Sequence, residues 1–507
     1  RERVFQNIQA DFSQKKLPPA QLKSLRTMAG QKRPRKSIRR IIKDLRKLIL
    51  EVHPCWMMSP LSVSQFIELE SSDSPMIFDT VIFDEASQIF PEDAICSIFR
   101  AKQVIVAGDP EQMPPTSFGK LSNPGGDNAD EDEDDENPEF ESILNLSSVI
   151  LKQRRPLRLL WHYRSKYEEL IHASNQKIYN GDLITFPAAN QLAQKPVKFV
   201  YVENGFFDRG KTKTNPNEAK GVAEQVIKLL RDQKDGLGER KSIGIIALGA
   251  AQTECIEEEI NKLRIENPQL EEYFNENLPS DQRLFIKNLE TVQGDERDII
   301  ILSIGYGKDA SGKIYQNFGP INQKEVGHRR LNVAVTRAKE QMYVFCSFHH
   351  FDLKVTEEHS KGLNFLRDYL RYVESDLIDE QEKKQSDKDK MLIEQQIHTA
   401  LRMRGYAVRS DIGCSEYKVG LGILRPNSVG SFVLGIECDG EMYNSAKTAR
   451  DRDRLRQEVL ENYGWHIHRV WSRDWWVNPE RELQKIQKSI DKALTDISHI
   501  SANMALV

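Results

Sequence analysis

Hydrophobic and polar positions alternate with two different periods along the first 350 residues. Short β-branched runs at 80–83 and 104–107 end beside acidic residues and enclose a helical stretch. Helical spacing at 218–230 and 252–263 then alternates with four more strand-like runs, at 197–202, 242–247, 298–304 and 341–346. Strands that alternate with helices predict parallel sheets covered by helices. We therefore expect an α/β protein in which the later strands form a second parallel sheet.

The pattern changes near residue 350. A charged, strand-poor stretch holds one helical segment at 363–373 and a polar run at 379–390, which predicts a linker. Helical and strand-like segments return at 391–404, 417–424, 432–437 and 466–471. A chain of 507 residues is too long for a single core. The predicted domains are a first lobe at 1–145, a second lobe at 146–350, a helical linker at 351–389 and a third domain at 390–500.

Composition narrows the class of protein. Hydrophobic residues make up 39% of the chain and charged residues 29%, and no apolar run is long enough to span a bilayer, so we expect no membrane insertion. The six cysteines lack short paired spacings, which favours reduced thiols and a cytoplasmic location. The net charge of −4 hides an acidic block at 127–136, predicted to be a disordered surface insertion. It also hides a basic amphipathic helix at 32–47, whose cations either contact phosphates or are simply solvated.

Two adjacent carboxylates, Asp84 and Glu85, follow the apolar run Val81-Ile82-Phe83. The carboxyl ends of strands are where α/β sheets present their ligands. In phosphoryl transfer, one carboxylate can hold the magnesium that bridges the β- and γ-phosphates, and its neighbour can orient and deprotonate the attacking water. The pair is consistent with that chemistry, although strand ends are also often acidic because they meet solvent.

Four further segments, in a fixed order, make the pattern specific. They are Gly108-Asp109-Pro110-Glu111-Gln112-Met113-Pro114-Pro115, His162-Tyr163-Arg164-Ser165, Gln293-Gly294-Asp295-Glu296-Arg297-Asp298 and Arg329-Arg330-Leu331-Asn332-Val333-Ala334-Val335-Thr336-Arg337-Ala338-Lys339. Together with the paired carboxylates they resemble, over roughly residues 50–350, the superfamily 1 helicases related to the nonsense-mediated-decay motor. The resemblance implies RecA-like P-loop lobes and a motor that needs ATP and Mg²⁺ and acts on nucleic acid.

The resemblance also assigns roles to single residues. It implies that Gln112 senses the γ-phosphate and that Arg164 and Arg337 are arginine fingers, which stabilise the transition state when the lobes close on ATP. Residues implied to complete the nucleotide cleft are Gln293, Gly294, Glu296 and Arg330, and residues implied to face the nucleic-acid backbone are Ser59, Ser62 and Thr291. For Arg330 a surface ion pair is the alternative interpretation.

A core of this kind needs a glycine-rich loop ending in Gly-Lys-Ser or Gly-Lys-Thr upstream of the paired carboxylates, and none precedes Asp84. A literal match at Gly205-Phe206-Phe207-Asp208-Arg209-Gly210-Lys211-Thr212 lies downstream instead. Five residues separate it from the next helical pattern, whereas a phosphate loop must open directly into a helix. We therefore interpret it as a decoy. Because the chain begins with Arg1, we expect an upstream part of the same polypeptide to carry the true loop and to complete the truncated first lobe.

The third domain resembles a very-short-patch-repair-type endonuclease over roughly residues 390–490, which implies a restriction-endonuclease-like α/β fold. The segments that carry the likeness are Glu394, Tyr417-Lys418-Val419-Gly420-Leu421-Gly422-Ile423, Gly435-Ile436-Glu437-Cys438-Asp439-Gly440, Ala449-Arg450-Asp451-Arg452-Asp453-Arg454-Leu455-Arg456 and Gly464-Trp465-His466-Ile467-His468-Arg469-Val470-Trp471. Glu437 and Asp439 alternate along one strand, so they face the same side and, with a third carboxylate, could hold a hydrolytic Mg²⁺.

Two departures from the endonuclease pattern predict an inactive nuclease. Family members usually carry aspartate at the position of Gly420 and histidine at the position of Asn444, so a metal ligand and a general base are both missing. We expect the C-terminal part of an ATP-dependent helicase or translocase, acting on DNA in preference to RNA, with a non-cutting DNA-binding domain and a role in DNA processing or anti-phage defence. The alternatives are an active nuclease with a motor remnant and a non-enzymatic nucleic-acid-binding scaffold.

Overall fold

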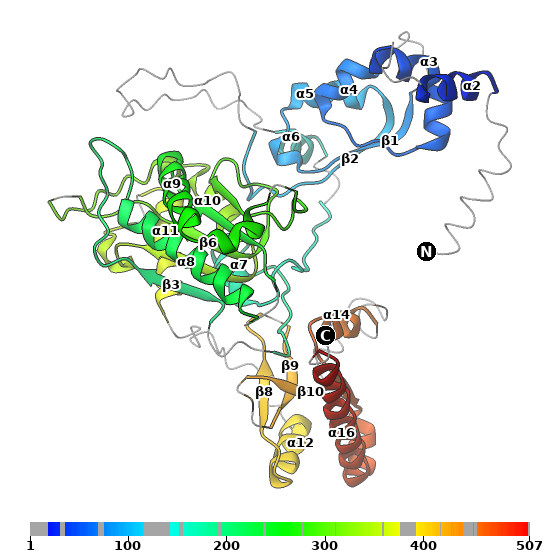
Figure 1. Ribbon diagram of the computed structural model, residues 1–507. Helices are drawn as coiled ribbons and strands as arrows, with labels where there is room; N and C mark the ends of the chain where they lie inside the picture. Colours follow the sequence, from blue (N-terminus) through cyan, green and yellow to red (C-terminus); the bar gives the residue numbers. More distant parts are fainter. Residues whose placement is uncertain are drawn as a thin grey trace. The chain divides into compact units, whose positions relative to one another are not determined.

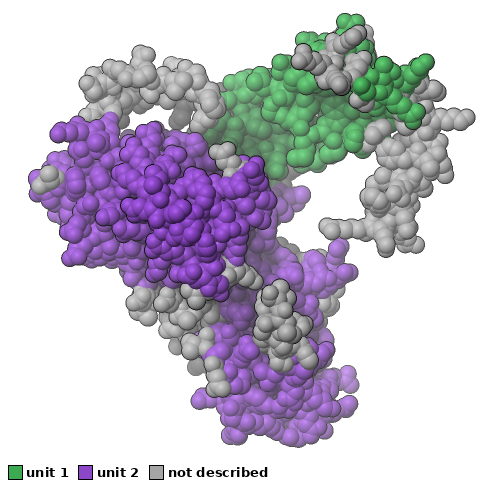
Figure 2. Space-filling view, viewed as in Figure 1, with its two compact units in different colours: residues 1–156 green, residues 157–507 purple. Residues whose placement is uncertain are grey.

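The computed structural model describes residues 19–30, 36–68, 76–115, 142–151, 156–190, 195–236, 240–275, 277–309, 311–356, 359–375, 392–415, 417–426, 428, 430–439, 450 and 454–504. The acidic block at 127–136 and Asn444 lie outside these ranges. The chain divides into two compact units, residues 1–156 and 157–507 (Figure 2). Each unit is described by itself.

The first unit contains two parallel strands with helices before, between and after them (Figure 1). Its elements are α2 (Pro19–Ala29), α3 (Ile38–Val52), α4 (Pro60–Phe66), β1 (Phe78–Phe83), η1 (Ala86–Gln88), α5 (Pro91–Ile98), β2 (Ala101–Val106) and α6 (Ile143–Ile150). The helix predicted at 32–47 is confirmed from Ile38 onward as α3, which begins after the cap residue Ser37 and continues to Val52; residues 32–35 lie outside the described ranges. A small core of Phe83, Ala86, Ala94 and Ile143 lies beneath the ends of the strands.

Apolar side chains on these two strands are unusually exposed. Ile82 is 64% exposed, Ile105 44% and Val104 38%. Parallel sheets normally have both faces covered, because their crossover helices pack on both sides. The described strands of this unit therefore carry apolar surface that their own helices leave uncovered.

The second unit begins with a five-stranded parallel sheet in the order β3-β7-β6-β4-β5. Its strands are β3 (Val197–Tyr201), β4 (Ile243–Ala247), β5 (Phe285–Asn288), β6 (Arg297–Ser303) and β7 (Ala338–Cys346). The helices around it are α7 (Glu169–Lys177), α8 (Pro216–Lys234), α9 (Ala250–Glu266), α10 (Gly327–Val335) and α11 (Lys361–Glu374), with short 3-10 turns η2 (Pro268–Phe274), η3 (Gly319–Asn322) and η4 (His350–Asp352) (Figure 1). Strand β4 is buried along its whole length, as expected for an interior strand covered on both faces. The predicted second parallel sheet is confirmed.

A second, mixed sheet in the same unit has the order β11-β10-β9-β8. Its strands are β8 (Val408–Ile412), β9 (Val419–Leu424), β10 (Phe432–Cys438) and β11 (Ile467–Val470), and its helices are α12 (Leu392–Met403), α14 (Arg456–Asn462), α15 (Ser472–Val477) and α16 (Pro479–Met504). Strands β8, β9 and β10 are antiparallel, while β11 lies parallel to β10. This sheet and its helices form the endonuclease-like domain. Strand β8 was not anticipated, because charged Arg409 and Asp411 interrupt its apolar positions.

Within the described ranges, no helix combines the length and the apolar character that crossing a membrane requires. All six cysteines are free thiols, as their spacing predicted.

Candidate nucleotide and nucleic-acid site

Asp84 and Glu85 follow the last residue of β1 directly, at the carboxyl end of the parallel pair. Both are exposed, and the Glu85 amide donates to Asp84 Oδ1 at 3.0 Å. Glu85 has a left-handed backbone with φ 52°, a conformation that costs free energy for a residue with a side chain. Bonds on both sides hold the turn, since Ala86 donates to the Ala107 carbonyl and Gln88 to the Glu85 carbonyl. The two carboxylates are therefore presented by a sharp, fixed turn.

Gln112 lies in the turn that follows β2, next to the turn that carries Glu85. Asp109 shapes this turn, because its carboxylate accepts from the Glu111 amide at 2.9 Å and from Gln112 Nε2 at 3.1 Å. A Cβ added to Gly108 would lie 3.0 Å from the Ala86 nitrogen. A side chain at this position would crowd the backbone of the other turn, so glycine favours the close approach of the two turns. The role of Asp109 was missed, although an aspartate that bonds its own turn is a recognisable signal.

Ser59 and Ser62 lie at the start of α4. Ser59 caps the helix, since its hydroxyl accepts from the Ser62 amide at 3.2 Å and donates to the Ser62 hydroxyl at 3.0 Å. Capping explains the serine at 59 without a ligand. Contact with nucleic acid at this helix start stays a prediction.

Arg164 and Glu296 come together in the second unit although 132 positions separate them. Arg164 Nε lies 2.7 Å from Glu296 Oε2, and Lys339 Nζ lies 2.9 Å from Glu296 Oε1. Burial acts to raise the pKa of Glu296, but hydrogen bonds from Lys339 and Arg164 outweigh it and lower that pKa. Lys339 is the last residue of the motif at 329–339, but it was not among the predicted site residues.

The segment that carries Arg164 is attached to the start of β7. Ser165 Oγ donates to the Ala338 carbonyl at 3.3 Å, and the Lys166 amide donates to the Lys339 carbonyl at 2.7 Å. Burial, with a smaller contribution from the charge of Arg164, lowers the pKa of His162 to about 4. The ring is therefore neutral near pH 7, and its Nε2 accepts from the Ser165 amide at 3.1 Å.

Arg337 is buried inside the second lobe, with 2% of its surface exposed. Its Nε donates to the Val333 carbonyl at 2.7 Å, at the end of helix α10. Cations commonly bond the last carbonyls of a helix in this way. The described contacts of Arg337 are thus within its own lobe, and its action on a phosphate stays a prediction.

The remaining predicted cleft residues lie on the loop after β5 and on α10. Gly294 has φ 87° and open space around it. Arg330 forms an ion pair with Glu290 at 2.6 Å, which is the alternative interpretation raised for it. Exposed Thr291 bonds Asn288 Oδ1 at 3.0 Å in a local turn, and Gln293 follows two residues later.

The glycine-lysine-threonine match at 205–212 does not open into a helix. Helix α8 begins at Pro216, after its cap residue Asn215. The Thr212 amide and hydroxyl both bond the Asp208 carboxylate, so the loop closes on itself. A Cβ at Gly205 would lie 2.4 Å from the Ser347 Cβ, so the loop backbone there packs against protein. These features confirm that the helix does not follow the match directly.

Glu218, in the first turn of α8, is completely buried at the carboxyl edge of the five-stranded sheet. Its Oε1 accepts from Ser303 Oγ and from the Gly305 amide, both at 2.6 Å. Burial raises the pKa of Glu218 to about 8 although these bonds lower it. The carboxyl is therefore largely protonated at pH 7. The sequence indicated only the start of a helix here.

Glu437, one of the two predicted nuclease carboxylates, is surrounded by protein groups. The Tyr417 hydroxyl donates to Oε1, Arg456 Nε lies 3.8 Å from the same oxygen, and Arg469 lies 3.5 Å from Oε2. The side chains of Glu437, Arg456 and Arg469 are 11%, 12% and 18% exposed. The carboxylate is thus neutralised inside the domain.

Asp439 lies just beyond β10 and has a different set of partners from Glu437. Its two oxygens accept from the amide and the hydroxyl of Ser472, each at 2.7 Å, at the start of α15. A Cβ at Gly420 would lie 2.8 Å from Glu394 Oε1, the end of a flexible side chain that would have to shift to admit an aspartate there. Among the residues that the structure describes, no group of three or more His, Cys, Asp or Glu side chains is arranged to hold a metal ion.

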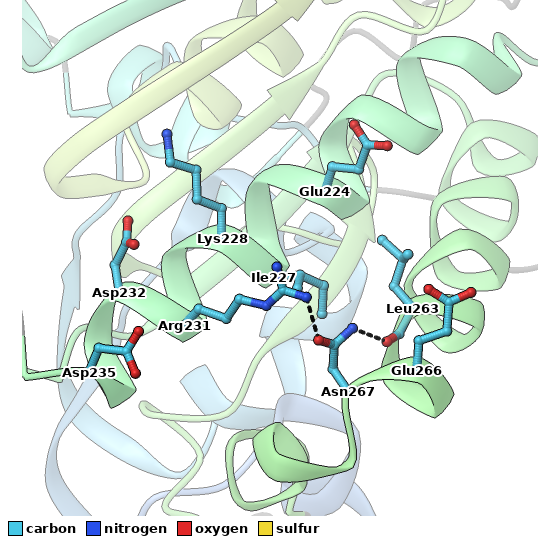
Figure 3. Close-up of a pocket in the computed structure, with 9 residues that line it drawn as sticks. All are labelled: Glu224, Ile227, Lys228, Arg231, Asp232, Asp235, Leu263, Glu266 and Asn267. Carbon is cyan, nitrogen blue, oxygen red and sulfur yellow. Dashed lines mark hydrogen bonds between the residues drawn. The ribbon is translucent and has the colours of Figure 1, made fainter.

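A surface pocket of about 370 Å³ opens between α8 and α9 (Figure 3). Charged side chains from both helices line it, and Arg231 donates to Asn267 across it. It contains none of the predicted site residues. We assign it no part in the chemistry.

Three family models match the chain. The AAA_11 model (AAA domain) matches residues 7–120, the AAA_12 model (AAA domain) residues 140–349, and the REase_MTES_1575 model residues 393–490. The order of these matches is the order in which the motifs appear.

Curated relatives include ATP-dependent helicases. The chain is 30% identical over 451 residues to the ATP-dependent helicase MG140 homolog of Mycoplasma pneumoniae, covering 84% of this chain and 38% of that protein. It is 32% identical over 436 residues to ATP-dependent helicase MG140 of Mycoplasma genitalium, covering 82% and 37%. The DNA-binding protein SMUBP-2 of Rattus norvegicus is 23% identical over 357 residues, covering 63% and 31%. The chain therefore spans less than two fifths of the length of these relatives.

Proposed function

Because the chain belongs to the superfamily 1 helicases with AAA_11 and AAA_12 domains, here followed by an REase_MTES_1575 domain, we propose that it is part of an ATP-dependent motor that moves along DNA. The observation that carries the proposal is the edge where β1 and β2 end. Two exposed carboxylates and the Gln112 turn meet there, held together by the close approach at Gly108.

The donor set at this edge fits Mg²⁺, which prefers carboxylate oxygens and usually retains several waters. Asp84 would hold the ion, which when bound neutralises charge on the phosphates. Glu85 would accept the proton of the attacking water, and Gln112, oriented by Asp109, would detect the γ-phosphate. Arg164 and Arg337 would stabilise the transition state from the second lobe.

The phosphate loop itself would come from an upstream part of the same polypeptide, which would also complete the first lobe. Two observations support this proposal. The relatives are much longer than the chain, and the apolar side chains of β1 and β2 are exposed in the described part of the unit. The closed loop at 205–212 is unsuited to the task.

Nucleic-acid-stimulated phosphate release tests the proposal. The chain alone should hydrolyse ATP at background level, and the polypeptide extended upstream should hydrolyse it faster when DNA is added. Lys211→Ala should change neither rate. Turnover by the chain alone that Lys211→Ala abolishes would instead identify the 205–212 loop as the phosphate loop.

For the endonuclease-like domain we propose DNA binding without cleavage. The engaged oxygens of Glu437 and Asp439 support the absence of cleavage. Of the described arginines near α14, Arg454 pairs with Glu458 at 2.8 Å and Arg456 approaches Glu437, and we propose exposed Arg450 as a candidate for phosphate contact. Duplex DNA affinity should fall steeply with salt, because phosphate contacts release counterions. An affinity that does not respond to salt would contradict this role.

A further inference from the structure

Segment 184–190 of the second lobe lies between that lobe and the endonuclease-like domain. At one end it pairs with the chain just before Arg164, since the His162 amide donates to the Ile184 carbonyl at 2.9 Å. At the other end the Phe432 amide, at the start of β10, donates to the Ala189 carbonyl at 2.9 Å. One extended segment therefore joins the Arg164 region to the central strand of the other domain.

Glu168 makes the most direct link between the two domains. It is 6% exposed, and its Oε2 accepts from the Cys414 amide at 2.8 Å and the Cys414 thiol at 3.3 Å. Its Oε1 accepts from the Thr185 hydroxyl of its own lobe. Burial, with the nearby carboxylates Glu168 and Glu169, raises the pKa of the Cys414 thiol, so the thiol remains protonated and able to donate. A residue four positions after Arg164 is thus bonded to the turn between β8 and β9.

Further bonds from the endonuclease-like domain reach backbone carbonyls of the same region. The Tyr463 hydroxyl donates to the Ser165 carbonyl at 3.3 Å, and Trp465 Nε1 donates to the Pro187 carbonyl at 2.8 Å. Such bonds depend on the position of the backbone, so they hold the segment in one register.

An apolar cluster surrounds these bonds. Phe186 and Ala189 of the lobe are buried among side chains of the other domain, and the rings of Phe186 and Tyr417 lie 4.8 Å apart. The buried members from the endonuclease-like domain are Ile412, Tyr417, Val419, Phe432, Leu460 and Trp465. The interface between the second lobe and the endonuclease-like domain therefore has a buried apolar core, as stable protein interfaces do.

Arg164 is therefore held from two sides. On one side, the residues after it bond the start of β7; on the other, Ser165 and Glu168 bond the endonuclease-like domain. We propose that the endonuclease-like domain acts as an internal support that fixes the Arg164 segment for ATP hydrolysis, with Glu168 as the positioning residue. The proposal rests on the motor function proposed above. In this proposal, the domain that we expect not to cut DNA contributes to ATP hydrolysis by positioning Arg164.

The test uses the extended polypeptide that contains the phosphate loop, with steady-state ATP hydrolysis in the presence of DNA. Glu168→Ala should lower kcat roughly tenfold while KM for ATP stays within about twofold, because the arginine acts in the transition state. Glu168→Gln keeps an oxygen for the Cys414 amide and should recover most of kcat. Tyr463→Phe, which removes one hydroxyl, should lower kcat by a few-fold. Glu203→Ala, at an exposed position, is the matched control and should behave as the parent.

Hydrogen exchange gives a readout independent of activity. The amide of Cys414 should exchange faster in Glu168→Ala than in Glu168→Gln or the parent. Faster exchange with unchanged kcat would overturn the proposal, and so would a kcat loss that Glu168→Gln fails to rescue. If Glu168→Ala does not fold, Tyr463→Phe decides by the same kinetic criterion. A parent polypeptide without ATPase activity would contradict the motor function, a result distinct from any of these.

Discussion

Two pairs of carboxylates lie at the ends of strands in this chain, and their surroundings differ. Asp84 and Glu85 are exposed on a strained turn, where the Glu85 amide donates to Asp84 and the Gln88 side chain donates to Glu85. Glu437 and Asp439 are bonded by a tyrosine, two arginines and a serine from distant parts of their domain. In sequence, both pairs lie at the end of an apolar run, and only the departures at Gly420 and Asn444 predicted that the second pair is inactive.

The comparison shows that residue type and strand position do not make a catalytic site. A carboxylate serves a metal or a water only if its oxygens are available, and partners within the protein compete for them. In the endonuclease-like domain, Glu437 has become part of the structure, and through Tyr417 it contacts the interface with the second lobe.

The largest expected effect is a loss of turnover at the first pair alone. In the extended polypeptide, Glu85→Gln should lower DNA-stimulated ATP hydrolysis about 100- to 10,000-fold, the range typical of a lost general base. Glu437→Gln should leave the rate within about threefold. Phosphate release measures both, with exposed Glu92→Gln on α5 as the control. Equal losses at Glu85 and Glu437 would remove the distinction between the pairs.

The free energy of unfolding should depend more on the Glu437 side chain than on the Glu85 side chain, the reverse of the effect on turnover. Glu437→Ala leaves Arg456 and Arg469 nearly buried without their carboxylate, which typically costs about 3–5 kcal/mol. Glu85→Ala removes an exposed side chain and should change the free energy of unfolding by less than about 0.5 kcal/mol. Urea unfolding of the chain compares the two. A small cost at Glu437 would indicate that its ion pairs contribute little.

A third carboxylate, Glu218, is completely buried, and the donors described for it, the Ser303 hydroxyl and the Gly305 amide, are neutral. Its folded pKa of about 8 lies above the ordinary 4.5, so its contribution is fully present below pH 4.5 and is lost as pH rises through 8. Between pH 5 and 8.5 the parent should lose roughly 2–4 kcal/mol relative to Glu218→Gln, whose amide cannot ionise. Unfolding at several pH values measures this. Exposed Glu257→Gln is the control, and parallel curves for parent and Glu218→Gln would show that Glu218 is ionised.

The smallest effect is expected where the nuclease pattern is restored. Gly420→Asp places a carboxylate beside Glu394, whose flexible side chain can move away, and should lower the free energy of unfolding by no more than about 1 kcal/mol. The double variant with Asn444→His should still not nick plasmid in Mg²⁺ or Mn²⁺, because Glu437 and Asp439 keep their protein partners. Nicking by the unmodified chain, lost in Glu437→Ala, would establish the active-nuclease alternative instead.

Much of the local structure follows from the sequence by itself. The apolar spacing predicted α3, and the strand-like runs predicted the second parallel sheet. Motif order predicted the helicase family that the comparisons bear out. Periodicity and turn chemistry act over a few residues, so they can be recognised without knowing what lies across the fold. Periodicity did not predict β8, because charged Arg409 and Asp411 interrupt the apolar positions of this edge strand.

Only the tertiary structure decided which partners each functional side chain acquires. The contact of Arg164 with Glu296 spans 132 positions, and the bond between Glu168 and Cys414 spans 246. The arginines that neutralise Glu437 come from α14 and from β11, the latter placed beside β10 by a crossover. Such pairings depend on how sheets and domains pack, and no local pattern encodes them. For that reason the sequence identified both carboxylate pairs and predicted an inactive nuclease from Gly420 and Asn444, and only the fold showed which protein groups bond Glu437 and Asp439.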